Sequence, residues 1–162
     1  MIFVAVGTQK FSFNRLLQSV DELVAGGTIR EPVFAQTGHS GYEPANYESA
    51  AFLSKEEFAQ KISSCDLLIT HSGVATIVAG LKEGKPVIVA PRLKKYGEHV
   101  DDHQVQIAES FSDQNYVIMC CDMEQLPDCV EQAKNHKFDR YVSQRQLMQE
   151  TIAEFLNDYM KL

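Results

Sequence analysis

Residues 65–108 read CDLLITHSGVATIVAGLKEGKPVIVAPRLKKYGEHVDDHQVQIA and contain the same pattern twice. Two short apolar runs, 67–69 and 87–90, predict buried strands. Each run is followed by a polar loop and then by apolar residues at helical spacing. A strand, a loop and a helix in succession are typical of sheets whose strands run parallel. This stretch therefore predicts an α/β fold, and its two loops are candidates for binding an anionic, hydroxylated ligand.

The rest of the chain continues this alternation. Strands are predicted at 2–6, 32–36, 50–53, 66–70, 86–90 and 116–120. Helices are predicted at 13–24, 55–63, 74–83, 102–110, 124–134 and 143–160, with Ser12 and Ser54 as the N-caps of the first two. The pattern predicts one domain over residues 1–162, a Rossmann-like, doubly wound parallel sheet with helices on both faces.

The last predicted helix carries a wide apolar stripe near the C-terminus. The stripe consists of Leu147, Met148, Thr151, Ile152, Phe155, Leu156 and Tyr159. One interpretation is that this helix folds back on its own sheet. The other is that residues 143–162 dock on a partner protein.

Bulk properties exclude several classes of protein. The formal net charge of −7 disfavours a nucleic-acid-binding protein. No apolar run approaches the roughly 18–20 residues that cross a bilayer, and the N-terminus lacks the basic region of a signal peptide. The four cysteines show neither a CxxC spacing nor a zinc pattern. We therefore expect free thiols and a cytoplasmic location.

Four loops follow predicted strand ends, where open α/β sheets bind their ligands: 7–9, 36–38, 70–73 and 91–104. The segment after Thr70 is the most specific. A helix beginning near Gly73 presents unpaired N–H groups, which suit a phosphate, and Ser72 and Thr76 add hydroxyl groups. Gly73 can adopt a positive φ and lets a ligand approach the backbone. The alternative is that Ser72 simply caps the helix and Gly73 forms a turn.

The loop 91–104 is long for its class and crowded with polar groups. A metal site through His99 and His103 is conceivable, but His99 precedes the predicted helix, so a shared face is not secured. His103 and Gln104 are better suited to bind sugar hydroxyls, and a solvated acidic turn is the third interpretation. We predict neither a metal nor a cofactor. No motif for hydrolytic or covalent catalysis is present.

Together these motifs resemble the C-terminal, donor-binding half of GT-B glycosyltransferases of family 28. The matching segments are Gly7-Thr8, 36–38, 66–77, 84–92 and 102–104 followed by Ala108. The start of the chain, the run 96–104 and the short length resemble PssE-type subunits of two-subunit bacterial polysaccharide glycosyltransferases. Those are similar to the cytosolic subunit of the eukaryotic UDP-GlcNAc transferase.

The resemblance implies a UDP-sugar donor, a hexose or N-acetylhexosamine transferred to a lipid-diphosphate-linked saccharide, and a membrane-associated, PssD-type partner that binds the acceptor. The residues implied at the donor diphosphate and nucleotide are Gly7, Thr8, Gln36, Thr37, Gly38, His71, Ser72, Gly73, Thr76 and Arg92. The residues implied at the sugar are Asp102, His103 and Gln104. The catalytic base is not identified; His99 and Glu98 are the local candidates, and the partner is another source.

Two positions depart from the family pattern. Position 75 is Ala where Gly is common. Ala79 stands where the family usually has an acidic residue that meets the nucleotide ribose. A missing charge-assisted hydrogen bond is worth about 1.5–3 kcal/mol. This departure supports an alternative, a non-catalytic accessory subunit that enhances a partner transferase.

Overall fold

The computed structural model describes residues 1–143. Its centre is one six-stranded sheet with the order β3-β2-β1-β4-β5-β6, in which every neighbouring pair is parallel. This is the strand order of the Rossmann fold. The strands β2 and β3 are added on one side of β1, and β4, β5 and β6 are added on the other side. The predicted doubly wound parallel sheet is confirmed.

The elements follow the predicted alternation. The strands are β1 (Ile2–Ala5), β2 (Val33–Gln36), β3 (Glu48–Ala50), β4 (Leu67–Thr70), β5 (Val87–Val89) and β6 (Ile118–Met119). The α-helices are α1 (Asn14–Ala25), α2 (Lys55–Ser64), α3 (Val74–Lys82), α4 (His103–Asp113) and α5 (Leu126–Asn135). Two short 3-10 turns, η1 (Lys94–Tyr96) and η2 (Met123–Gln125), precede α4 and α5.

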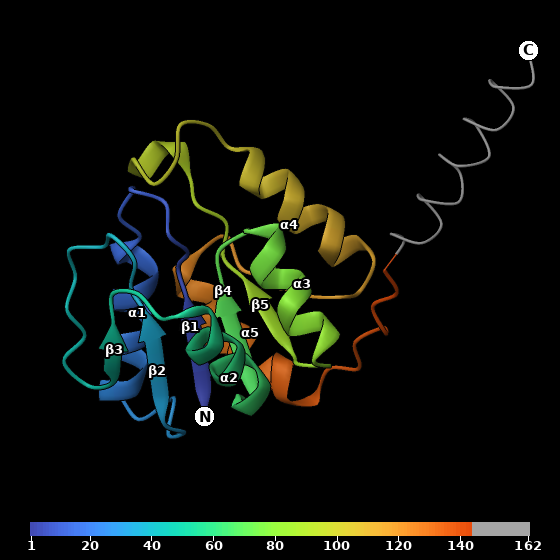
Figure 1. Cartoon of the computed structure of the whole chain (residues 1–162), viewed down its shortest axis with the longest axis horizontal. Coiled ribbons are helices and arrows are strands. Elements are labelled where there is room, and N and C mark those ends of the chain that lie inside the picture. Colours follow the sequence, from blue (N-terminus) through green and yellow to red (C-terminus); the bar gives the residue numbers. More distant parts are fainter. Residues whose placement is uncertain (144–162) are drawn as a thin grey trace, which may run out of the picture.

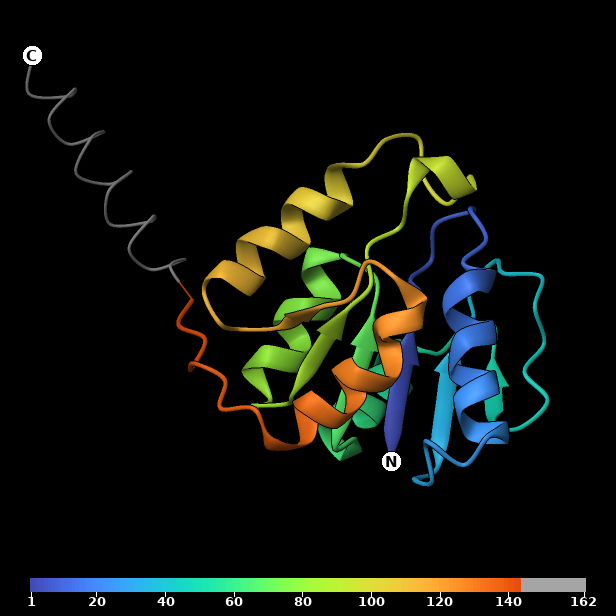
Figure 2. The same ribbon diagram turned by 180° about the vertical axis from the view of Figure 1, so that it is seen from behind.

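Helices cover both faces of the sheet because the side chains of a strand alternate between its faces. On β1, Ile2 and Val4 pack in the core layer under α1 and α5. Phe3 and Ala5 point to the opposite layer, under α2, α3 and α4. Figure 1 shows α2 and α3 in front of the sheet, and Figure 2 shows α1 and α5 on the other side. All four β1 side chains are buried, as expected of a central strand.

The third strand and the N-cap of the first helix were predicted wrongly. The third strand lies at Glu48–Ala50 rather than 50–53. As an edge strand, paired only with β2, it is half-exposed and lacks the apolar run on which the prediction relied. Ser12 is not the N-cap of α1; that position is Phe13, whose backbone N–H donates to Ser40 Oγ at 2.9 Å.

The C-terminal part agrees with the prediction as far as Asn135. The predicted helix 124–134 is divided into η2 and α5, with Pro127 in the first turn of α5, where its missing N–H costs no helical hydrogen bond. The predicted helix 143–160 lies outside the described residues. Within residues 1–143, no helix has the length and apolar character required to traverse a bilayer.

Candidate functional site

A cleft of about 570 Å³ lies at the carboxyl ends of β1, β2 and β4. The cleft contains six of the predicted site residues: Gly7, Thr8, Gln36, His71, Gly73 and Thr76. Strands β1 and β4 are neighbours although the chain diverges to opposite sides after them, so this cleft is at the switch point of the sheet. The structure thus brings together the strand-end residues that the sequence singled out.

Two glycines enclose the His71 imidazole at the base of this cleft. A Cβ atom on Gly73 would lie 2.3 Å from His71 Nε2, and one on Gly7 would lie 2.6 Å from the same nitrogen. Gly7 also has φ +81°, whereas Gly73 has φ −76°. Gly73 therefore does not use the positive φ that glycine allows. Glycine is required there because the ring of His71 occupies the space of a side chain.

The tautomer of His71 follows from its contacts. Nδ1 lies 3.3 Å from the carbonyl oxygen of Ala5, which can only accept, so Nδ1 carries the proton. Burial, and then the charge of Arg92, lowers the pKa of His71 from 6.5 to about 4. At neutral pH the ring is uncharged, and Nε2 is an acceptor beside the backbone of Gly7 and Gly73.

Helices α2 and α3 both begin at the cleft, but only α2 is capped by a side chain. Ser54 Oγ accepts from Glu57 N–H, and the Glu57 carboxylate accepts from Ser54 N–H, which completes a capping box and confirms the predicted cap. The N-cap of α3 is Gly73, and no side chain caps it. The first N–H groups of α3 therefore suit an anionic ligand.

Two buried oxygen atoms beside the cleft have no hydrogen-bond partner among residues 1–143: Gln36 Oε1 and Ser72 Oγ. A buried polar atom without a hydrogen-bond partner destabilises the folded state, so native structures contain few of them. Gln36 lines the cleft. Ser72 does not line the cleft and is only 1% exposed. A ligand hydroxyl or amide in the cleft would satisfy Gln36 directly.

Thr37 and Gly38 hold neighbouring loops rather than line the cleft. Thr37 N–H donates to the carbonyl of Ala50, the last residue of β3, and Gly38 N–H donates to that of Ala51, the next residue. Gly38 has φ +57°, and a Cβ there would lie 2.4 Å from the carbonyl oxygen of Gly7. These two residues therefore position the Gly7 loop.

Arg92 is fully buried, which differs from its predicted contact with a ligand. Its guanidinium donates to the carbonyl oxygens of Val6 at 2.6 Å and Phe11 at 2.9 Å, and makes longer bonds to those of Ser12 and Glu98. Burial lowers the pKa of Arg92 to about 10, so it remains charged at neutral pH. Arg92 thus ties the loops after β1 and β5 together beneath the site.

Gln104 is buried as well and joins two loops. Its side-chain oxygen Oε1 accepts from Arg92 N–H at 3.0 Å and from Ser72 N–H at 3.3 Å. The start of α4 is in this way fastened to the segment that leads into α3. Gln104 is a positioning residue in this arrangement.

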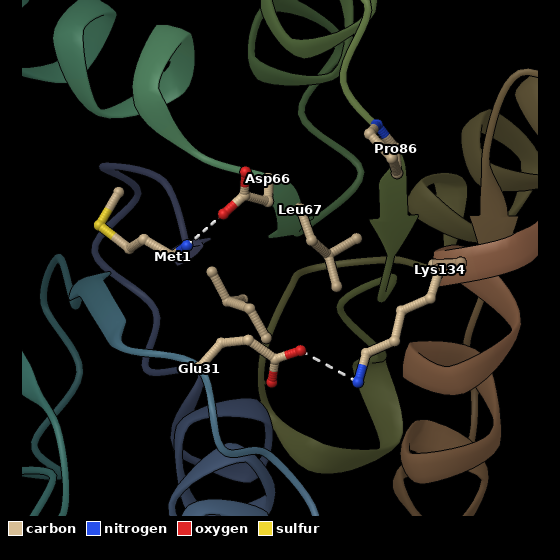
Figure 3. Close-up of a pocket in the computed structure, with 8 residues that line it drawn as sticks. Met1, Glu31, Asp66, Leu67, Pro86 and Lys134 are labelled. Carbon is tan, nitrogen blue, oxygen red and sulfur yellow. Dashed lines mark hydrogen bonds and ion pairs between the residues drawn. The ribbon is translucent and has the colours of Figure 1, made fainter.

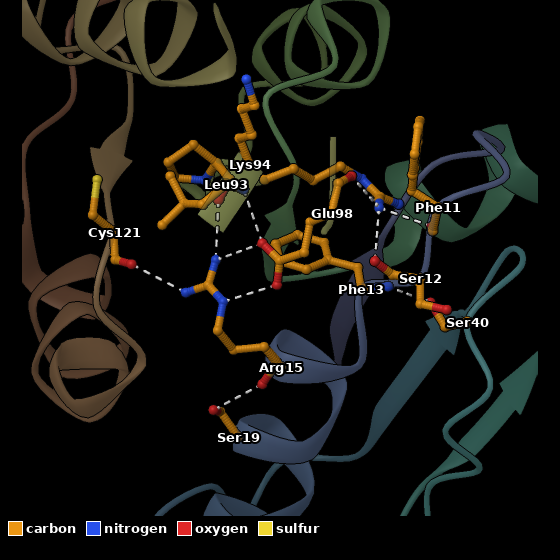
Figure 4. A network of polar contacts seen from close by, with 12 residues as sticks. Phe11, Ser12, Phe13, Arg15, Ser19, Ser40, Leu93, Lys94, Glu98 and Cys121 are labelled. Carbon is orange, nitrogen blue, oxygen red and sulfur yellow. Dashed lines mark hydrogen bonds and ion pairs between the residues drawn. The ribbon is translucent and has the colours of Figure 1, made fainter. Parts of the chain in front are cut away.

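Glu98 is bound in an ion pair with Arg15 of α1, as Figure 4 shows. The carboxylate accepts two bonds from Arg15, each 3.0 Å long, and one from Leu93 N–H at 2.9 Å. Arg15 also donates to the carbonyl oxygen of Cys121. With 3% of Glu98 exposed, a structural role replaces the predicted role as a catalytic base.

The remaining predicted residues lie outside the cleft, in the loop before α4 and at the first residue of the helix. His99 is 8% exposed, and Asp102 and His103 are exposed. Asp102 Oδ1 accepts from Lys94 N–H. His103 contacts the carboxylate of Asp101, and hydrogen bonds from the His103 side chain and backbone lower the pKa of Asp101. The predicted sugar-binding residues thus form a second cluster, joined to the cleft through Gln104.

A smaller hollow of about 240 Å³ lies at the opposite, amino-terminal edge of the sheet (Figure 3). Glu31 pairs with Lys134 at 3.0 Å across it, and the amino group of Met1 pairs with Asp66. Ligands of open α/β sheets bind at the carboxyl edge. This hollow contains none of the predicted site residues.

Sequence reasoning missed the contribution of α2 to the cleft. Leu53, Ser54, Lys55 and Phe58 form one wall of it. The Ser54 cap was recognisable as a helix start, and every helix of a parallel α/β unit begins at the carboxyl edge. That rule was the available signal for adding Lys55 to the candidate site.

Comparisons with known proteins agree with this fold. A family model described as the glycosyltransferase family 28 C-terminal domain matches residues 1–160. The UDP-N-acetylglucosamine transferase subunit ALG13 of Candida albicans is 30% identical over 103 residues, which cover 64% of this chain. The chain spans only 33% of the length of that relative.

Solved structures show the same architecture. The solution structure of ALG13 has a TM-score of 0.59 at 19% identity and covers 93% of both chains. The glycosyltransferase SnogD from Streptomyces nogalater has a TM-score of 0.59 at 16% identity, covering 83% of this chain and 34% of its own. At these identities the likeness concerns the fold.

Proposed function

This chain belongs to the glycosyltransferase family 28 C-terminal domain, and from that membership we propose that it is the donor-binding subunit of a two-chain glycosyltransferase. The donor is a UDP-sugar. The product is a lipid-diphosphate-linked saccharide extended by a hexose or an N-acetylhexosamine, in polysaccharide biosynthesis. The observation that carries the proposal is the uncapped start of α3 at the switch-point cleft, beside Gly7 and Gly73.

The proposed binding mode uses these features in turn. The diphosphate lies against the first N–H groups of α3, with Thr76 and Thr8 as hydroxyl donors, and Lys55 adds a positive charge from α2. Departure of the nucleoside diphosphate leaves negative charge on the phosphate, and a fixed dipole stabilises such charge without reorganisation. No metal is required for this step.

The sugar extends from the diphosphate toward the loop before α4, where Asp102 and His103 offer polar groups. Gln104 holds that loop in place. Because Glu98 is engaged by Arg15, the base that activates the acceptor comes from elsewhere, either His99 or a partner chain. We propose a membrane-associated, PssD-type partner that binds the acceptor, with this chain in the cytoplasm and at the membrane only through that partner.

Calorimetric titration with UDP, UDP-glucose, UDP-galactose and UDP-N-acetylglucosamine tests the proposal. Gly73→Ala is expected to weaken binding at least about tenfold, the loss of one charge-assisted hydrogen bond, because the new Cβ displaces either His71 or the start of α3. Gly41→Ala is the matched control, since a Cβ there meets nothing within 4 Å. If none of these ligands binds, with or without a partner, the donor site is refuted.

Ala79 favours a second candidate function. It lies in a groove of about 380 Å³ between α2 and α3, which shares Lys55, Phe58 and Thr76 with the cleft. Because residue 79 is alanine, it offers no carboxylate to a nucleotide ribose in this groove. A chain that binds the donor weakly would act as an accessory subunit that enhances a partner transferase.

Introducing a carboxylate at position 79 tests whether the nucleotide ribose lies in this groove. Ala79→Glu is expected to tighten UDP binding by about one to two orders of magnitude, the value of one charge-assisted hydrogen bond. Ala59→Glu places the same charge on the opposite wall of the groove and should give no gain. Equal or weaker binding by Ala79→Glu would mean that the ribose does not lie in this groove.

A further inference from the structure

The loop that precedes α4, together with the first residue of that helix, brings together His99, Asp101 and His103. Asp101 Oδ1 lies 3.1 Å from His99 Nδ1, and His103 Nδ1 contacts the same oxygen. One ligand atom from each residue lies within 4.8 Å of the other two. Two imidazole nitrogens and a carboxylate oxygen form a donor set typical of zinc and related metals.

The backbone creates this cluster by reversing direction. Gly97 ends η1 with φ +69°, a left-handed conformation that glycine adopts without strain. The following turn places the His99 ring 4.6 Å from that of His103, centroid to centroid. His99 need not be on α4 to face His103, which removes the objection raised by the sequence.

His99 is held in place without any ligand. Its side chain is 7% exposed, and its ring centroid lies 5.9 Å from that of Phe11. The side chains of Asp101 and His103 are 57% and 48% exposed, so the open side of the cluster faces solvent. The geometry combines a buried, fixed ligand with two accessible ones.

We propose that His99, Asp101 and His103 bind a Zn²⁺-like transition-metal ion, with a fourth position open to solvent. Zinc takes nitrogen and oxygen ligands at about 2.0–2.2 Å in a tetrahedron, which places neighbouring ligand atoms about 3.3 Å apart. The His99–Asp101 separation of 3.1 Å meets this requirement. The exposed His103 side chain would have to move away from Asp101 Oδ1, which it contacts directly, and toward His99 to complete the set.

The contacts of Asp101 define the competing explanation. Its Oδ1 also accepts from His103 N–H at 3.1 Å, at the start of α4. In a cluster that serves only to cap α4, the His99 ring would accept from Asp101 N–H, as it does here at 3.3 Å, and the cluster would have no affinity for a metal. A metal-binding cluster needs both rings and the carboxylate.

An occupied site would hold the start of α4 through His103. The next residue, Gln104, is bound to the backbone of Ser72 and Arg92. The metal would therefore stabilise the junction between this loop and the cleft. An occupied site would leave the partner chain as the source of the base and Asp102 as the polar group for the sugar, because His99 and His103 would then bind the metal. This inference goes beyond the proposed transfer reaction, which needs no metal.

The test is a calorimetric titration of the metal-free, full-length chain with Zn²⁺ alone, without any nucleotide sugar. It uses a Cys121→Ser background, since Cys121 is a half-exposed thiol and the other three cysteines are buried. We expect one ion per chain. His103→Asn and Asp101→Asn are each expected to weaken binding at least about tenfold, as loss of a direct ligand should exceed the smallest effect known for outer-shell partners.

Asp102→Asn is the matched control, because it removes a neighbouring carboxylate that is not part of the cluster. It is expected to leave Zn²⁺ affinity unchanged. Absence of saturable binding, or equal binding by His103→Asn, overturns the proposal and leaves the cluster as a cap. A thiolate charge-transfer band on Co²⁺ substitution would also overturn it. Circular dichroism of each variant checks that the fold is retained.

Discussion

Replacing Glu98 by alanine is expected to lower the free energy of unfolding by about 3–5 kcal/mol, the range for breaking a buried ion pair. The carboxylate is almost fully buried and accepts two hydrogen bonds from Arg15 and one from Leu93 N–H. Its removal leaves a guanidinium of which 18% is exposed without its partner. Urea unfolding followed by circular dichroism measures the loss.

Glu109→Ala is the control, since Glu109 is exposed on α4 and surface substitutions change stability by at most about 0.5 kcal/mol. A double-mutant cycle with Arg15→Ala isolates the pair, and the double variant should lose less than the sum of the two single losses. Normal stability of Glu98→Ala would contradict the structural role. It would return Glu98 to the list of candidate bases.

Acidification from pH 7 toward pH 4 is expected to destabilise the protein by about 3 kcal/mol through His71 alone, at about 1.4 kcal/mol for each pKa unit. The folded chain holds the pKa of His71 at about 4, against an ordinary value of 6.5. Above pH 6.5 His71 is neutral in both states. Below it the unfolded chain binds the proton first, so stability falls until the folded state is protonated too.

The measurement compares urea unfolding at pH 7 and pH 4.5 for the native chain and for His71→Asn. An asparagine can still donate to the Ala5 carbonyl but does not titrate, so the variant should lose about 2–3 kcal/mol less over this interval. His39→Asn changes an exposed histidine and should reproduce the native pH dependence. Identical slopes for the native chain and His71→Asn would show that His71 titrates normally.

Ligand binding provides a second test of the pKa of His71. A diphosphate beside Nε2 favours the protonated ring, because an opposite charge nearby raises the pKa of an imidazole. When UDP binds between pH 4 and pH 7, the His71 ring should therefore take up a proton. Titrations in buffers of different ionisation enthalpy measure that uptake.

The sheet was predictable because its signals are local and strong. Central strands such as β1 and β4 are buried on both faces and read as continuous apolar runs. The edge strand β3 lacks this signal, and its predicted range began two residues and ended three residues too late. The strand-end rule also located six residues of the cleft, since parallel strands end at one edge.

Residue types and spacing alone established an α/β fold with a parallel sheet. They also predicted polar, glycine-containing loops at the carboxyl edge of that sheet, suited to an anionic sugar ligand. Only the tertiary structure decided which polar residues face that edge. Arg92, Glu98 and Gln104 are polar in the sequence, yet each is buried and bound to groups from distant segments, such as Val6, Arg15 and Ser72. The tertiary structure also shows why residue 73 is a glycine, since the His71 ring occupies the space of a side chain there. Side-chain burial and ring packing depend on contacts between segments far apart in the chain, whereas strand and helix patterns depend on neighbours.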